Sequence, residues 1–120
     1  MRNLFLAASA FALLTAAPAH ADANSDLKTL VDDVWAAALK EQPVFASALG
    51  VETYAGLVSD YTLTAQDRRA ADASAFLKRL DAIPASELDA ASKVEAGILR
   101  RTLNSTIEGN RFGQRAINFT

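Results

Sequence analysis

The residue types that carry most enzymatic and metal chemistry are sparse in this 120-residue chain. It has no cysteine, and its one histidine, His20, lies near the amino terminus. Zinc sites use histidine or cysteine, or several converging carboxylates, and serine or cysteine nucleophiles need a base beside them, most often histidine. The five glycines are scattered, so no glycine-rich phosphate loop is formed. From residue types alone we expect no catalytic, cofactor or metal site in this chain.

A few side chains remain as candidates for a binding surface. Asp32 and Asp33 are adjacent, but neighbours on a helix point about 100° apart, which favours a solvated face over a shared ligand. Trp35 offers a stacking surface, yet its helical spacing among leucines favours a core position. Tyr54 and Tyr61 lie in an expected loop and are the best candidates for a functional surface, although a role in covering the core is favoured.

The charged residues give no sign of a polyanionic partner. The net charge is −2, so neither nucleic acid nor an anionic membrane is expected as a partner. An enzyme that uses carboxylates alone, as glycosidases do, is the least supported reading. Three adjacent basic pairs are expected to form ordinary solvated faces: Arg68-Arg69, Lys78-Arg79 and Arg100-Arg101.

The first 21 residues have the parts of a secretory signal peptide. Arg2 follows the amino terminus, and the 14 residues Leu4–Ala17 are almost wholly apolar. Ala19 and Ala21 place small side chains at the two positions that signal peptidase reads, so cleavage is expected after Ala21. A spanning helix needs about 20 apolar residues, so we expect no stable membrane anchor. The sequence therefore predicts export to the periplasm or the exterior.

The remaining residues 22–120 are expected to form one helical segment. Removal of residues 1–21 takes away Arg2 and His20 and leaves 11 basic against 14 acidic residues. An exported protein can use disulfides, but this one has no cysteine, so its fold must depend on core packing. The length supports one domain, or one piece of a domain.

The apolar pattern predicts an all-α fold with about four helices. Asn24 and Ser25 are the expected N-caps of the first helix, which ends before Gln42. Pro43 suits the first position of a short second helix, and Gly50 suits its end. Residues 51–63 are expected to form an ordered loop. The buried stripe of the first helix recurs at helical spacing: Leu27, Leu30, Val31, Val34, Trp35, Ala38 and Leu39.

Two longer helices follow the loop. The third helix, residues 65–82, is expected to begin at a capping box of Thr64 and Asp67. On its surface Arg68 is expected to pair with Asp72. Its buried residues are expected to be Ala70, Ala73, Phe76, Leu77 and Leu80. It ends at Ile83-Pro84.

The fourth helix, residues 90–108, is expected to have Asp89 as its N-cap. Its inward residues are expected to be Val94, Ile98, Leu99, Thr102, Leu103 and Ile107. Gly97 costs about 1 kcal/mol against alanine unless close helix packing explains it. Beyond residue 108, no helix or strand is expected that could bury the apolar side chains of Phe112, Ile117 and Phe119.

The order of these landmarks carries a family resemblance. The landmarks are Leu30-Val31-Asp32-Asp33-Val34-Trp35, Pro43 to Gly50, Tyr54, Leu80-Asp81-Ala82-Ile83, Leu88 and Ile98-Leu99-Arg100-Arg101-Thr102-Leu103. Over about residues 27–119 they resemble the opening of exported bacterial proteins of the domain of unknown function 885 family.

The resemblance implies a longer, largely helical parent protein. Members of the family look like zinc metallopeptidases, with a His-Glu-x-x-Pro-Gly-His segment far downstream whose histidines would hold the metal. Nothing in this chain matches that segment, so no catalytic residue is carried over. What the resemblance implies is an amino-terminal, non-catalytic part of a larger exported protein, with zinc only in the longer parent. Its partner would be the remainder of the parent chain, or an unknown protein or peptide. The alternative is a complete small periplasmic helical bundle that acts as a binding or adaptor module.

Overall fold

The computed structural model describes the backbone of residues 19–113 and the side chains of residues 22–113. All regular structure in this part of the chain is helical, which confirms the expected all-α class with four helices. In chain order the elements are α1 (Ala19–Glu41), α2 (Pro43–Ala48), the 3-10 turn η1 (Glu52–Tyr54), α3 (Leu63–Asp81), the 3-10 turn η2 (Ala85–Glu87) and α4 (Ala90–Arg111). Most of the expected signal peptide, together with Ile117 and Phe119, lies outside the described residues.

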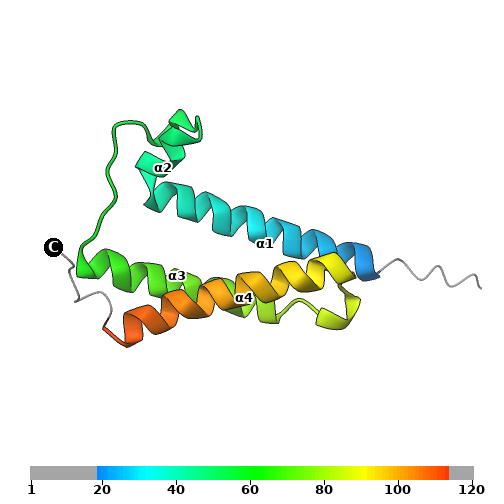
Figure 1. Ribbon diagram of the computed structural model, residues 1–120. Coiled ribbons are helices and arrows are strands. Elements are labelled where there is room, and N and C mark those ends of the chain that lie inside the picture. Colours follow the sequence, from blue (N-terminus) through cyan, green and yellow to red (C-terminus); the bar gives the residue numbers. More distant parts are fainter. Residues whose placement is uncertain (1–18, 114–120) are drawn as a thin grey trace, which may run out of the picture.

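Three long helices form the body of the molecule. Helices α3 and α4 lie side by side and run in opposite directions, and α1 lies along this pair in the same direction as α4 (Figure 1). Helix α2 and the turn η1 stand at the carboxyl end of α1, away from the α3–α4 pair (Figure 1). Within residues 19–113, no helix has both the length and the apolar character that crossing a bilayer requires.

The core lies where the amino-terminal half of α1 meets the other two long helices. Leu27 and Leu30 are 0% and 1% exposed, and both belong to one buried cluster. The other buried members come from every long helix and from the residue after η2: Ala23, Ala73, Leu80, Leu88, Leu99 and Leu103. Burial of each leucine side chain stabilises the fold by about 1.5–3 kcal/mol, so these contacts hold α1 on the pair.

Helix α1 begins earlier than the sequence indicated. The expected N-caps Asn24 and Ser25 lie inside the helix, and the Asn24 side chain instead accepts the backbone N–H of Asp89 at 3.2 Å. Ala23 lies one turn before Leu27 on the same buried face, so packing extends the helix past the polar lead. The expected cleavage point after Ala21 therefore falls in the first turn of α1.

The short helix α2 follows its predicted boundaries. Pro43 occupies the first turn. At the other end the N–H of Gly50 donates to Ser47 O at 3.0 Å, and the N–H of Val51 donates to Ala46 O at 2.9 Å. These two bonds form a Schellman motif, which requires a positive φ at Gly50, and the observed φ is 80°.

Of the two caps predicted for the longer helices, one is confirmed and the other is wrong. Asp89 caps α4 as expected, accepting the N–H of Ser92 at 2.7 Å. The predicted Thr64 cap is wrong, because α3 begins at Leu63 and its N-cap is Thr62, whose hydroxyl accepts the N–H of Ala65 at 3.2 Å. Helix-forming residues follow both Thr62 and Thr64, so the local sequence pattern did not tell which threonine is the N-cap.

The buried face of α4 is rotated from the predicted one. Leu99 and Leu103 are buried as expected, but Val94 and Ile98 are each 64% exposed and Thr102 is exposed as well. The apolar residues of α4 that pack partly buried against the cluster are Ala96 and Ile107, on the side of Leu99 and Leu103. The helix is covered on that side only, so the apolar residues on its outer side stay in solvent. On α3, Ala70, Ala73 and Leu80 are buried, and Phe76 and Leu77 are partly so, as expected.

Gly97 has no packing reason to be glycine. A Cβ placed on Gly97 would meet no atom within 4 Å, and its φ is not positive. We predict that Gly97→Ala raises the free energy of unfolding by about 0.5–1 kcal/mol, because alanine restricts the unfolded chain and favours the helix. The matched control Gly50→Ala should lower it, since Gly50 needs its left-handed φ. Denaturant melts of both variants measure this, and a destabilised Gly97→Ala protein would contradict the open environment of Gly97.

Candidate functional site

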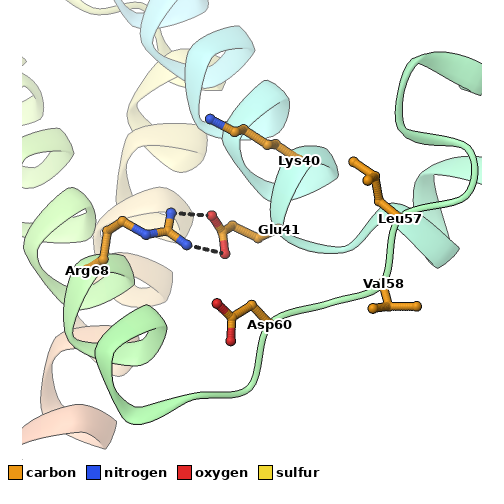
Figure 2. A pocket seen from close by; sticks show the side chains of 6 residues that line it. All are labelled: Lys40, Glu41, Leu57, Val58, Asp60 and Arg68. Carbon is orange, nitrogen blue, oxygen red and sulfur yellow. Dashed lines mark hydrogen bonds and ion pairs between the residues drawn. The ribbon is translucent and has the colours of Figure 1, made fainter.

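An open pocket of about 350 Å³ lies where α1 ends and α3 begins. One wall comes from the end of α1 and the start of α3, and the other comes from the chain that leads into α3 (Figure 2). Its six lining residues combine charged and aliphatic side chains: Lys40, Glu41, Leu57, Val58, Asp60 and Arg68.

Glu41, the last residue of α1, is the centre of this region. Its carboxylate accepts two N–H groups from Arg68, at 2.5 and 3.2 Å, as Figure 2 shows. It also accepts the Nε–H of Arg69 at 2.7 Å. The Glu41 side chain is only 17% exposed. Three charge-assisted hydrogen bonds therefore join the end of α1 to the second turn of α3, and the two-pronged geometry with Arg68 is of the stronger kind.

Arg69 connects a third segment to the same carboxylate. Its second N–H group donates to the backbone carbonyl of Asp60. The Asp60 carboxylate in turn accepts the backbone N–H of Thr62 at 2.9 Å. One guanidinium thus binds the end of α1 on one side and the chain just before α3 on the other.

The hydrogen bonds set the protonation of the acidic groups. The two hydrogen bonds from Arg68 lower the pKa of Glu41, Arg69 adds to this effect, and partial burial opposes it. The pKa of Asp60 is lowered because the backbone N–H of Thr62 stabilises its charged form. The Glu41 carboxylate raises the pKa of Arg68. All three groups are therefore charged at neutral pH.

This arrangement suits structural binding better than proton transfer. A general acid or base works best when its pKa lies near the working pH, and the pKa of Glu41 is shifted away from neutrality. The two arginines already donate three hydrogen bonds to the Glu41 carboxylate, which can accept about four. The pocket therefore has an ion pair as one wall, with the aliphatic side chains of Leu57 and Val58 opposite it.

Sequence reasoning did not identify this ion cluster. Arg68-Arg69 was expected to be an ordinary solvated face, with Arg68 paired to Asp72, but both arginines bind Glu41 and Arg69 is only 24% exposed. The partners lie 27 and 28 positions apart in the sequence, so no helical spacing links them. The other two basic pairs are as expected: Arg79 and Arg100 make half-exposed ion pairs with Asp33 and Asp81.

The structure separates the other candidate residues. Asp32 pairs with Lys28 and Asp33 pairs with Arg79, so the two acids face different partners on the surface, as expected. The expected core position of Trp35 is wrong. Trp35 is 51% exposed, and its ring and that of Phe45 form an edge-to-face pair with centroids 6.2 Å apart. It lies on the stretch of α1 that extends beyond the buried cluster.

The two tyrosines also differ from each other. Tyr54, in η1, is half-buried, which fits a covering role. Tyr61 is 79% exposed, so the expectation that it covers the core is wrong for this residue. Its backbone carbonyl accepts a hydrogen bond from Gln66, and its ring extends into solvent beside the start of α3.

The described residues do not fit the zinc that the family resemblance implies for the longer parent. Residues 22–120 hold no histidine and no cysteine, and no three acidic side chains gather in the part that the structure describes. The carboxylates that do lie close to one another are bound by arginines or backbone N–H groups. We assign no metal chemistry to these side chains.

Comparisons with known proteins add no relative. A scan of protein-family models, a search of curated proteins and a search of solved structures each found no match to this chain. The molecule defined by the fold and the site is thus a small helical bundle with an ion-paired pocket.

The lowered pKa of Glu41 predicts how its contribution to stability depends on pH. A carboxyl group with a depressed pKa stabilises the fold above its unfolded value and loses that effect as pH falls through its folded value. The unfolded value is close to 4.5. We predict that the unfolding free energy of wild type is about 1–3 kcal/mol higher than that of Glu41→Gln. This gap should be constant from pH 7 to pH 5 and should narrow below about pH 4.5.

Urea melts of both proteins across this pH range measure the gap. Asp89, whose carboxyl pKa is also lowered, caps α4, titrates in both proteins and cancels in the difference. A gap that is equal at pH 7 and pH 3, or that widens in acid, would show that the Glu41 charge is not what Arg68 and Arg69 bind.

Proposed function

We propose that this chain is an exported helical module whose residues 22–120 are a non-catalytic, amino-terminal part of a larger helical protein resembling zinc metallopeptidases. In this role the segment packs against further helices of the same protein and does no chemistry of its own. The support has two parts, an exposed apolar surface in the structure and the landmark order in the sequence.

The observation that carries the proposal is an exposed apolar face at the junction of α1 and α2. We call it the α2 face, and it consists of Trp35, Val44, Phe45 and Leu49. All four side chains are between 47% and 66% exposed, and no charged residue lies on α2. Contiguous apolar surface of a few hundred Å² marks an interaction site on a soluble protein, and tryptophan and other aromatics are enriched at such sites.

A helical partner suits this face. Helices bury each other through apolar stripes, and the sequence landmarks on the face, Trp35 and Pro43 to Gly50, belong to the pattern shared with the longer helical family. Zinc and its histidine ligands would then lie in another part of the parent protein. Export is supported by the signal-peptide pattern of residues 1–21, with Ala19 and Ala21 at the recognised positions.

The second candidate function is a complete small bundle that binds a partner as an adaptor. The favouring observation is that α1, α3 and α4 share one buried cluster, and that α3 and α4 have side-chain caps at their amino ends. Both candidates use the α2 face, but they differ in whether the covering helices belong to the same polypeptide.

Mass spectrometry of the protein isolated from its native cell separates these candidates. We expect a chain that begins at Asp22 and continues past Thr120, recovered outside the cytoplasm. A retained Met1 would contradict export, and a mass equal to residues 22–120 alone would contradict the larger parent and favour the adaptor.

Hydroxyl-radical footprinting then tests the face itself. Trp35 and Phe45 should react more slowly in the native protein than in isolated residues 22–120, because helices of the parent cover them. Equal labelling in the two samples would mean that the α2 face is not the packing surface.

A further inference from the structure

The stretch of chain between α1 and α3, which we call the excursion, contributes no residue to the buried cluster. The buried cluster and the residues packed against it include Val31 and Val34 of α1, but nothing from residues 35–72. Helix α2, η1 and the extended chain before α3 therefore stand outside this cluster, at the carboxyl end of α1 (Figure 1). Pro43 and Ala46 of α2 are buried, but neither belongs to the cluster. Stability is not uniform in such a molecule, and segments with few core contacts open most easily.

The two ends of this excursion meet at one side chain. Residues 42–60 leave the bundle after Glu41 and return at Asp60, and Arg69 binds both points through its Nε–H to the Glu41 carboxylate and its terminal N–H to the Asp60 carbonyl. Arg68 adds two hydrogen bonds to Glu41. At the first end, Gln42 has a non-helical backbone, with φ −124° and ψ 65°, so α1 and α2 are joined at a bend.

We propose that residues 42–60 form a latched lid that opens as a unit, and that Arg69 is the latch that holds both of its ends to α3. The lid carries α2, η1 and one wall of the pocket, Leu57 and Val58. The opposite wall, Glu41 and Arg68, stays with the long helices. The width of the pocket is therefore set by the latch, and loss of the Arg69 bonds opens the pocket and frees α2 while α1, α3 and α4 stay packed.

The fork of the guanidinium makes arginine specific for this role. Arginine presents several N–H donors in a rigid plane, whereas lysine is a single compact charge on a flexible stem. Lysine at position 69 would keep the positive charge but could not hold the Glu41 carboxylate and the Asp60 carbonyl in the same way. Arg69→Lys and Glu41→Gln therefore weaken the latch from its two sides with little change in side-chain volume.

Native-state hydrogen exchange read by peptide mass spectrometry on the purified protein tests the lid. In Glu41→Gln and in Arg69→Lys, we expect amides of residues 42–60 to exchange about tenfold faster or more, since hydrogen bonds to charged groups are lost. Peptides of α4 should stay more protected than residues 42–60 in every variant, and their exchange should accelerate by no more than the loss of global stability that denaturant melts measure. Two controls each remove an ion pair elsewhere: Asp33→Asn breaks the pair with Arg79, and Asp81→Asn breaks the pair with Arg100. Neither should change exchange in residues 42–60.

Each other outcome overturns the proposal. Unchanged exchange in residues 42–60 would mean that Arg69 is not a latch. Equal protection of residues 42–60 and of α4 in wild type, or unfolding of both variants, would mean that the ion cluster supports the whole fold and that no separate lid exists. Acceleration by Asp33→Asn as large as by Arg69→Lys would show that any ion pair between α1 and α3 has the same effect.

Discussion

The burial of one stripe of α1 against the α3–α4 pair is the interaction on which the rest of the structure depends. Ala23, Leu27 and Leu30 follow one another at helical spacing and are almost free of solvent contact. They meet leucines from both other long helices, and such burial is the main favourable term in folding. The residues of α1 that belong to this cluster or pack against it end at Val34, so the last turns of α1 carry α2 outside the main core.

The division of α1 into two halves explains the two kinds of contact in the molecule. The amino-terminal half is packed by apolar side chains, whereas the far end combines the buried Leu39 with the charged hydrogen bonds of Glu41. Apolar burial is non-directional, but hydrogen bonds of this kind fix a geometry. The pocket lies at the charged end, and so does the α2 face with Trp35 and Phe45. The proposed packing role and the proposed lid therefore concern the same end of the molecule, although each rests on a different observation.

Features governed by neighbouring residues could be predicted from the sequence. The bounds of α2 follow from Pro43 and Gly50, and the start of α4 follows from Asp89, because proline, glycine and a capping carboxylate act on the backbone beside them. Features governed by contacts between residues far apart in the sequence could not be predicted in this way. Trp35 and Ile98 lie on regular apolar stripes, but the structure covers only one side of each helix, and periodicity does not tell which side.

The site illustrates the same limit. Glu41, Arg68 and Arg69 carry no spacing that links them, since their contact depends on how α1 and α3 converge across the excursion. The expected Arg68–Asp72 pair was the best local choice, and the tertiary partner replaced it.

The unfolding free energies of Leu27→Ala and Trp35→Ala, compared in one set of denaturant melts, test the central claim most directly. Leu27 is buried in the stripe and Trp35 lies on the same helix beyond it. The account predicts a loss of about 2–5 kcal/mol for Leu27→Ala, as for a buried leucine, and a much smaller loss for Trp35→Ala, although tryptophan is the larger side chain. A greater loss for Trp35→Ala would contradict the account, because α1 would then be held to the bundle by a side chain outside the buried cluster.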